Sequence, residues 1–552
     1  METTVTVNQT PPRKSFRKTI LTVAAAGIAV LGGLGTAYAQ LDLFKSPKMI
    51  YLEAEAQGMA DLSADVSELV AEYEKQMTPY LEQPVHSTLE ISNVKVDATV
   101  SPQAQQLLEL LNSAKLVVQS DIDQQKQIQY NLIGLHLKDK KLLGMEMFMD
   151  QNRVGFGVLD LYKKYGYVDW KDRDVLASKY GMEGLPKRLV TYNDVYSALQ
   201  ASKEELAAVL KDYALLYADS VKDAQVTLKK DVAFSEEGYQ TTARELTVTF
   251  TSEELNALVT RIAEKAKVDD KLLDLIYTRY QNLAKLMVDS GYPDTEIMSK
   301  DVFQSEYRKA FDDILAGLKS SERGKDGMKM VLLINGDDQI ISRKMVSTDE
   351  QGKEEPGYLH TVKWTNGSES YYRLSFGEIP DQDELKVTYK GKKNGSEKNG
   401  TLAIALKTKE ESDAELDIKV NSHSKEENSK ETGTLEFTVK GNDSATGEQM
   451  GLSGSINTSL TKSDKGRETQ SRIKLNFDQA TPDMPKSISL QLHGKDEFGK
   501  AISLPVLTAD NSVNLATLSD ADMLTLQQEL GMAAQQFMMN NMQLFQELGI
   551  TP

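Results

Sequence analysis

The serines, histidines and acidic residues of this 552-residue chain do not fall into the spacing of a catalytic motif. Gly451-Leu452-Ser453-Gly454-Ser455 misses the nucleophile-elbow pattern GxSxG by one position, and Ser422-x-x-Lys425 matches a serine–lysine pattern by letter only. No HExxH, Walker A or dinucleotide-binding glycine pattern is present. We therefore predict no catalytic residue and no enzymatic activity. An envelope hydrolase is the least favoured class.

The potential metal ligands are equally scattered. Asp337-Asp338 and Asp381-x-Asp383 do not continue into a calcium-loop pattern, so we interpret them as solvated turn carboxylates. The chain has no cysteine, which excludes thiolate sites and disulfides. We predict no metal site and no cofactor. The five histidines lie far apart and without ligand-like pairs: His86, His136, His360, His423 and His493.

Methionines supply the one candidate binding surface. Met145, Met147 and Met149 alternate along an expected strand and therefore share one face, and the C-terminal helix is also rich in methionine. Such flexible side chains suit an adaptable apolar groove, with a lipid or a partner helix as its occupant. Ordinary core packing between sheet and helix is the alternative. The candidate groove residues are Met145, Met147, Met149, Phe537, Met538 and Met542.

The elements that must position these residues can be predicted from apolar periodicity. Ser46-Pro47 is typical of a helix start, and spacings of three and four predict a helix over about 47–77. Period-two strands follow, and the pattern becomes mainly helical from about 172. Three pairs have the spacing of a capping box at a helix start: Ser202 with Glu205, Thr251 with Glu254, and Ser519 with Asp522.

From about residue 327 apolar triplets recur at alternate positions, as in Leu402, Ile404 and Leu406. Asn-Gly pairs between such runs predict hairpin turns, and we expect polar loops over 391–400 and 421–433. The predicted fold class is α+β, with antiparallel meander sheets that have one face covered by amphipathic helices, preceded by a single N-terminal transmembrane helix.

The boundaries follow from these patterns. We predict a cytoplasmic tail over 1–18, a transmembrane anchor or signal peptide over 19–40, and helix, antiparallel strands and a helical segment over 41–326. An antiparallel β meander with a C-terminal amphipathic helix then covers 327–552.

The uncharged run Thr19 to Ala39 sets the predicted location. It is long enough to cross a bilayer, and four basic residues precede it, which keeps the N-terminus inside the cell. This predicts a single-pass protein of the cell membrane with its ectodomain outside, and the membrane as a partner through the N-terminal helix. Ala37-Tyr38-Ala39 also fits a signal-peptidase site, so secretion after cleavage at Ala39 is the alternative. The net charge of −18 argues against nucleic acid as a partner.

Two segments carry a resemblance. LDLFKSPKMIYLEAEAQGM, directly after the apolar run, and TFTSEELNALVTRIAEKAKVDDKLLDLI resemble uncharacterised membrane-anchored ectodomain proteins of Gram-positive Firmicutes, from about residue 15 onward. The resemblance implies a cell-envelope location and supplies no activity. More loosely, a long meander closed by helices is similar to the half-barrel lipoprotein carriers of bacterial envelopes, on fold grounds alone.

The predicted function is a non-enzymatic cell-envelope ectodomain. It binds an apolar ligand, with lipid as a candidate, or an envelope protein, through a helix-covered antiparallel sheet. A purely structural or signalling membrane-anchored protein is the alternative.

Overall fold

The computed structural model describes residues 45–98, 102–138, 140–181, 186, 190–292, 296–320, 326–378, 383–408, 414–443, 448–478 and 485–547. The predicted cytoplasmic tail over 1–18 and the predicted anchor over 19–40 lie outside these residues.

Twenty strands form one continuous sheet. From edge to edge the strands follow the order β20, β6 to β1, β19 down to β9, β8 and β7. All neighbours are antiparallel except β20 and β6. The strands are β1 (Val85–Asp97), β2 (Ala114–Asp123), β3 (Ile128–Leu137), β4 (Lys140–Met149), β5 (Arg153–Gly157), β6 (Tyr165–Asp169), β7 (Val226–Glu236), β8 (Tyr239–Phe250), β9 (Gly327–Ile334), β10 (Ile340–Thr348), β11 (Glu354–Asn366), β12 (Glu369–Glu378), β13 (Glu384–Asn394), β14 (Glu397–Thr408), β15 (Ala414–Glu427), β16 (Lys430–Asp443), β17 (Glu448–Ser463), β18 (Gly466–Phe477), β19 (Ser487–Phe498) and β20 (Ser512–Asn514).

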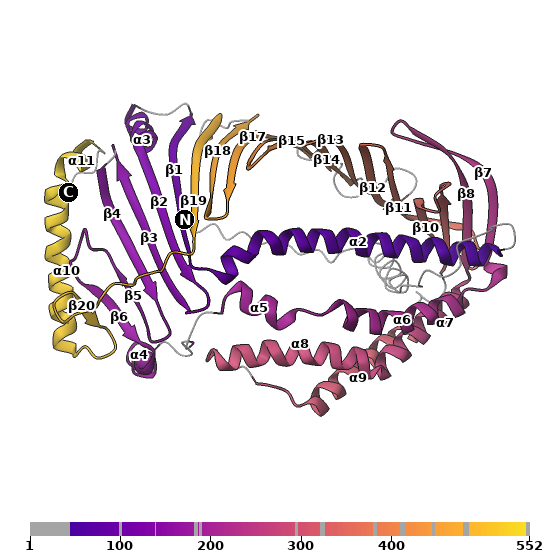
Figure 1. Cartoon of the computed structure of the whole chain (residues 1–552), viewed down its shortest axis with the longest axis horizontal. Coiled ribbons are helices and arrows are strands. Elements are labelled where there is room, and N and C mark those ends of the chain that lie inside the picture. Colours follow the sequence, from indigo (N-terminus) through magenta and orange to yellow (C-terminus); the bar gives the residue numbers. More distant parts are fainter. Residues whose placement is uncertain are drawn as a thin grey trace.

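The helices lie on one side of this sheet and at its two ends (Figure 1). The sheet bends as an arch, and the long helix α2 crosses beneath it. The helices are α2 (Pro47–Glu82), α3 (Pro102–Ser113), α4 (Arg173–Tyr180), α5 (Tyr192–Leu199), α6 (Lys203–Ser220), α7 (Ser252–Val268), α8 (Asp270–Asp289), α9 (Lys300–Ser320), α10 (Asp520–Asn540) and α11 (Met542–Glu547), with short 3₁₀ turns η2 (Trp170–Asp172) and η3 (Asp223–Gln225).

The local helix signals are confirmed. Ser46 caps α2 by accepting a hydrogen bond from the backbone N–H of Met49, which satisfies one of the free donors of the first turn. Capping boxes open α6 at Ser202, α7 at Thr251 and α10 at Ser519, each with the acidic residue three positions on. These contacts fix where the helices begin.

Tight turns join the meander strands at one margin of the sheet. The turns after β11, β13 and β15 place Gly367, Gly395 and Asn428 at positive φ angles of 58°, 61° and 55°. Two-residue hairpin turns require this backbone conformation, which glycine and asparagine tolerate. The predicted polar loops over 391–400 and 421–433 are therefore wrong, because the strands continue through both segments up to these short turns.

Alternation gives the sheet two different faces. We call inner face the one that carries Val387, Ile404 and Phe437, and outer face the one that carries Lys390 and Thr401. The register places Val387 beside Ile404 and Lys390 beside Thr401, so each face keeps its own row of side chains across neighbouring strands.

One end of α2 is fixed to the inner face by the main core. Ile50, Tyr51 and Ala54 of α2 pack on the buried side chains of β8 and β9, among them Leu246 and Leu332. Beside them, the guanidinium of Arg343 on β10 donates a hydrogen bond to the buried carboxylate of Glu55 on α2. The hydroxyls of Tyr51 and Tyr217 share a hydrogen bond of 2.5 Å. This cluster anchors the first two turns of α2.

The other end of α2 is held about ten strands away. Tyr80 donates a hydrogen bond of 2.5 Å to Asp496 on β19, and its ring meets that of Phe498 edge-on. Arg467 on β18 donates to the carbonyl oxygen of Gln76 at 2.8 Å and lies over the Tyr80 ring. Since both ends contact the same face, the middle of α2 must cross β11 to β17.

The predicted fold class is wrong. We expected antiparallel meander sheets with one face covered by helices, but β8 pairs with β9 and β1 pairs with β19, so strands from both predicted halves form a single sheet. The main core lies where α2 and α7 meet β7 to β10, and the long meander lies outside it. In the described part of the chain, no helix combines the length and apolarity needed to cross a membrane; the predicted transmembrane segment over 19–40 lies outside that part.

Candidate apolar binding face

The inner face carries a continuous apolar band across twelve strands, from β12 through β19 and β1 to β4. The register aligns the apolar residues of neighbouring strands in rows, such as Val387, Ile404 and Ile418. The apolar band comprises Tyr372, Leu374, Phe376, Leu385, Val387, Tyr389, Leu402, Ile404, Leu406, Leu416, Ile418, Val420, Leu435, Phe437, Val439, Leu452, Ile456, Ile473, Leu475, Phe477, Ile488, Leu490, Leu492, Leu89, Ile91, Leu116, Val118, Ile133, Leu135, Leu143 and Met145.

None of these band side chains is fully buried. Most are half-buried, and Tyr372, Tyr389 and Leu406 are 39%, 43% and 37% exposed. The same alternation on β8 and β9 gives fully buried side chains such as Leu246 and Leu332, because α2 and α7 cover them. The band therefore has the composition of a core without the cover of one.

One stretch of α2 beneath the band does not supply that cover. Residues 71–76 are all exposed, which is more than one full turn of helix. A helix packed on a sheet buries one stripe of side chains in every turn. Over this stretch α2 thus runs beneath the band without packing against it, while both of its ends are tied to the sheet.

The predicted groove methionines lie at one end of the apolar band. Met145, Met147 and Met149 follow one another on the inner face of β4, and Met145 and Met147 are 38% and 43% exposed. Leu143 on the same strand pairs with Leu135 and continues the row from the meander. The structure thus connects the predicted strand cluster to the apolar triplets of the second half.

The predicted helix cluster lies at the same end of the molecule (Figure 1). Phe537 and Met538 are on α10, Met542 begins α11, and Met538 and Met542 are exposed. The carboxylate of Glu529 on α10 accepts a hydrogen bond from Tyr162 and forms an ion pair with Lys164. Both partners lie between β5 and β6. That the two methionine clusters share one ligand stays a prediction.

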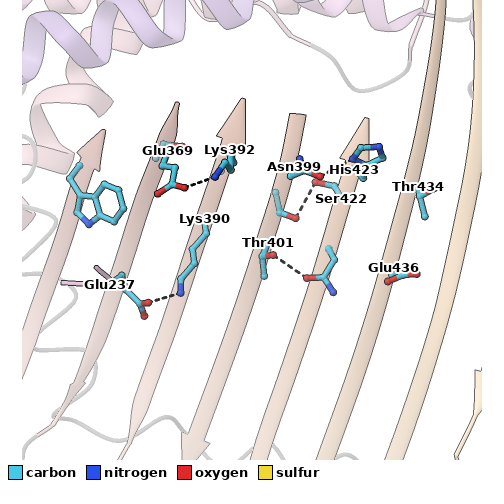
Figure 2. Close-up of a pocket in the computed structure, with 15 residues that line it drawn as sticks. Glu237, Glu369, Lys390, Lys392, Asn399, Thr401, Ser422, His423, Thr434 and Glu436 are labelled. Carbon is cyan, nitrogen blue, oxygen red and sulfur yellow. Dashed lines mark hydrogen bonds and ion pairs between the residues drawn. The ribbon is translucent and has the colours of Figure 1, made fainter. Parts of the chain in front are cut away.

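The outer face has the opposite chemistry and carries two polar hollows, the first of which Figure 2 shows. The first, of 510 Å³, lies over β12 to β16, with Trp364 at one side; the second, of 590 Å³, continues over β16 to β19 and β1. His423 and Thr434 line both, so the hollows adjoin. Asparagine, threonine, serine and glutamine supply most of the other lining side chains.

Both lysines of the first hollow are paired with acidic side chains. Lys390 contacts Glu237 at 2.5 Å, and Lys392 contacts Glu369 at 2.8 Å, as the dashed lines in Figure 2 show. Thr401 donates to Asn421 at 3.0 Å in the same row. Such cross-strand pairs stabilise a solvated sheet face and leave little net charge to attract an ion.

A serine and a histidine do meet on the outer face, where β10 and β11 adjoin. The Oγ of Ser342 lies 2.9 Å from Nε2 of His360, and the guanidinium of Arg373 lies 3.2 Å from Nδ1. Arginine only donates, so Nδ1 must accept and the ring proton must be on Nε2, which then donates to Ser342. In this tautomer the imidazole cannot take the serine proton, so the pair lacks the arrangement of a nucleophile and its base.

This histidine predicts an acid-sensitive stability. Burial, with the positive charges of Arg373 and Lys344, lowers the pKa of His360 to about 4, whereas an unfolded histidine titrates near 6.5. The folded state therefore binds fewer protons, and the stabilisation is complete above about pH 6.5 and is lost as the pH falls through about 4. Urea unfolding between pH 7 and pH 4 should show a smaller loss of free energy of unfolding in His360→Gln than in the unsubstituted protein. An equal loss in both would contradict this assignment.

In the structure, the residues of the serine–lysine pattern considered from the sequence do not lie together. Ser422 belongs to the inner face and Lys425 to the outer face of β15, so the lysine cannot reach the serine hydroxyl. His423 contacts Asn399, and His493 contacts Glu468. Across the described ranges, no group of three histidine or acidic side chains is arranged to hold a metal ion.

Solved structures similar to this chain are outer-membrane proteins. A loop-deletion form of OmpT of Vibrio cholerae is 7% identical, with a TM-score of 0.20, over 75% of this chain and 98% of that one. OccAB4 of Acinetobacter baumannii is 8% identical, with a TM-score of 0.22, over 76% and 98%. Wzi of Escherichia coli, described as a carbohydrate-binding β-barrel in capsule assembly, is 9% identical, with a TM-score of 0.22, over 88% and 98%. At these scores no argument about mechanism rests on the likeness.

No protein-family model matches the chain. No curated protein matches it either.

These comparisons correct three predictions. The resemblance to Gram-positive ectodomain proteins, with the looser one to half-barrel lipoprotein carriers, is not supported: no family model and no curated protein matches the chain, and the similar solved structures are outer-membrane proteins. The predicted cell-membrane location, with secretion after Ala39 as its alternative, and the predicted membrane partner both rested on an N-terminal helix. The described residues contain no helix that could cross a membrane, and the segment over 19–40 lies outside them; the similar solved structures are outer-membrane proteins. Similarity to bacterial envelope proteins is what remains.

Proposed function

We propose that this chain is a non-enzymatic binding protein whose apolar band holds acyl chains or another apolar ligand in the space between the sheet and α2. The observation that carries the proposal is the combination of a continuous apolar band, left half-exposed, with a helix whose residues 71–76 cross beneath it, are all exposed and so do not pack on it. Water against such a surface is unfavourable by roughly 25 cal/mol per Å² of apolar area. A ligand that replaces this water would stabilise the complex.

The outer face supplies the internal comparison. Over β13 to β19 its side chains are mostly charged or polar, and several are paired across strands, as expected for a face that water covers. The two faces belong to the same strands, so their difference does not arise from strand propensity. It supports a specific use for the inner face.

The direct test is to purify the chain natively, extract it with organic solvent and analyse the extract by mass spectrometry. Bound acyl lipids or another apolar small molecule are expected. An empty extract, together with no measurable binding of added oleate, would reject the proposal and favour the alternative of a purely structural or signalling protein. Chemical crosslinking to a defined protein partner would then identify that role.

A charge in the middle of the apolar band should abolish binding. Phe437→Asp places a carboxylate among the apolar rows of β15 to β17, where it would face the ligand without a partner. We expect the affinity for oleate, measured by equilibrium titration, to fall at least tenfold, which corresponds to about 1.4 kcal/mol.

Thr438→Asp is the matched control, because Thr438 follows Phe437 on the same strand and faces outward. It should bind oleate as the unsubstituted protein does. Equal losses in the two variants would show that the effect comes from strand damage and not from the inner face.

A further inference from the structure

The apolar band is much longer than one acyl chain. It crosses twelve strands, and at a spacing of about 4.8 Å this gives a length of roughly 50 Å. The hydrocarbon core of a bilayer is about 30 Å thick and holds two chains end to end, so a single chain reaches about 15 Å. Ligands with one or two acyl chains would therefore leave most of the band empty.

The band also continues without a charged residue. At the junction of the two halves of the sheet, Leu492 on β19 pairs with Ile91 on β1, which pairs with Leu116 on β2. The same row goes on through Leu135 to Leu143. From β4 to β19, a ligand that slides along this row meets aliphatic side chains at each step. Beyond β19 the row continues into Ser471 and Thr458, and the aliphatic path passes to the neighbouring row of Leu490, Ile473 and Ile456. No desolvated charge sets a barrier on this path.

The two ends of the band differ in access. The β12 end leads towards the buried core of α2, α7 and β8 to β10, which closes it. The β2 to β5 end lies beyond the span of α2, whose second attachment is at β18 and β19. Side-chain exposure is similar near both ends: Ile133 is 38%, Met147 43% and Phe156 52% exposed here, and Tyr372 is 39% and Tyr389 43% exposed near β12. The difference is that the main core adjoins the β12 end and not the β2 to β5 end, which we call the mouth of the band.

The shape limits what can occupy the part beneath α2. Both ends of α2 are tied to the sheet, through Glu55 and Arg343 at one end and Tyr80 and Asp496 at the other. A folded protein cannot pass under a helix fixed at both ends, whereas a flexible acyl chain can. Acyl amphiphiles therefore fit this space better than a protein partner.

We infer that the apolar band holds several acyl-chain amphiphiles at once, which enter at the mouth on β2 to β5 and move inward across the strands to the closed end at β12. The inference rests on the proposed function and extends it from binding to ordered loading. Methionine and phenylalanine at the mouth, with adaptable or broad apolar surfaces, suit the first contact with chains of different shape.

The absence of cysteine from the chain allows a clean test with single-cysteine variants. Ile133→Cys reports on the mouth and Ile404→Cys on the part beneath α2. Each variant is mixed with oleate, and the rate of maleimide labelling is followed over time. Protection is expected at position 133 first and at position 404 later, and native mass spectrometry should show more than one oleate per chain.

A barrier between the two positions separates loading from binding. Leu490→Asp with Leu492→Asp places two carboxylates on the inner face of β19. Protection at position 404 should slow at least tenfold, with position 133 unaffected. The control, Gln491→Asp on the outer face of the same strand, should change neither rate. If the double variant fails to fold, Leu490→Thr with Leu492→Thr keeps the strand and should slow position 404 to a smaller extent.

The outcomes distinguish this inference from the proposed function. Saturation by a single oleate would overturn ordered loading and leave binding intact. Protection at position 404 that is equally fast with and without the two aspartates on β19 would do the same. No protection at either position in the chain without the barrier would reject the proposed function itself.

Discussion

Replacing Glu55 with alanine is expected to lower the free energy of unfolding by about 3 kcal/mol. Glu55 is buried, and burial raises the pKa of its carboxyl although the guanidinium of Arg343 opposes the shift. Removing one partner of such a pair leaves the other charge without compensation, which costs roughly 3–5 kcal/mol in buried pairs. The lower end applies because the Arg343 side chain keeps 24% of its surface exposed and water can partly solvate it. Urea unfolding followed by circular dichroism measures the change.

Glu354→Ala is the matched control for this pair. Glu354 and Lys329 form an ion pair of 2.8 Å on the outer face of the sheet, and both side chains are well exposed. Exposed pairs contribute about 0–1 kcal/mol. A loss for Glu55→Ala no larger than that of Glu354→Ala would show that the anchor of α2 depends on its apolar contacts alone.

The second large effect is expected at Trp364 on β11. Its ring stacks between Tyr239 and Tyr371, at centroid distances of 5.1 and 5.5 Å, and keeps 8% of its surface exposed. With Phe234, these rings hold the tip of the β7–β8 hairpin against the outer face of β11 and β12. Trp364→Ala should therefore lower the free energy of unfolding by about 3–5 kcal/mol, as for other large-to-small core changes.

Hydrogen exchange would show where this stability is lost. Amides of the hairpin tip, 232–243, should exchange faster in Trp364→Ala, while those of β15 and β16 keep their protection. The control is Tyr372→Ala on β12, because Tyr372 faces inward and is 39% exposed. If both variants lose the same stability, the aromatic cluster does not hold the hairpin as described.

Local chemistry made much of the secondary structure predictable. The caps at Ser46, Ser202, Thr251 and Ser519 depend only on residues within one turn of the helix start. Strand alternation, for example at Leu402, likewise depends on neighbours two positions away. Such signals are complete within a few residues of sequence.

The arrangement of the sheet and the candidate site could not be predicted in the same way. The pairing of β1 with β19 joins Val85 to Phe498, and no local pattern encodes which edge a strand will meet. From the sequence, the residues of the apolar band could therefore be recognised only as separate apolar triplets and a separate methionine cluster. Only the register of intervening strands shows that Met145 and Phe437 lie on one surface.

Polar composition also misled the prediction of loops. The residues from Asn421 to Glu427 are almost all hydrophilic, which is typical of a loop. In the structure they are the last part of β15, where both sheet faces have become polar near the hairpin turns. Backbone pairing with β14 and β16 holds them in the strand, and this tertiary effect overrides their composition.

The position of β9 to β19 between two groups of strands from earlier in the chain has a consequence for biosynthesis. β8 offers a ready edge on which β9 and then each later strand can add as it leaves the ribosome, whereas β1 must wait for β19, the last of the series. Until that closing step, β1 and the newest strand each present unpaired backbone to other chains. The nascent protein should thus be most prone to aggregation just before residue 498 emerges, and a chaperone that shields strand edges would help it most at that moment.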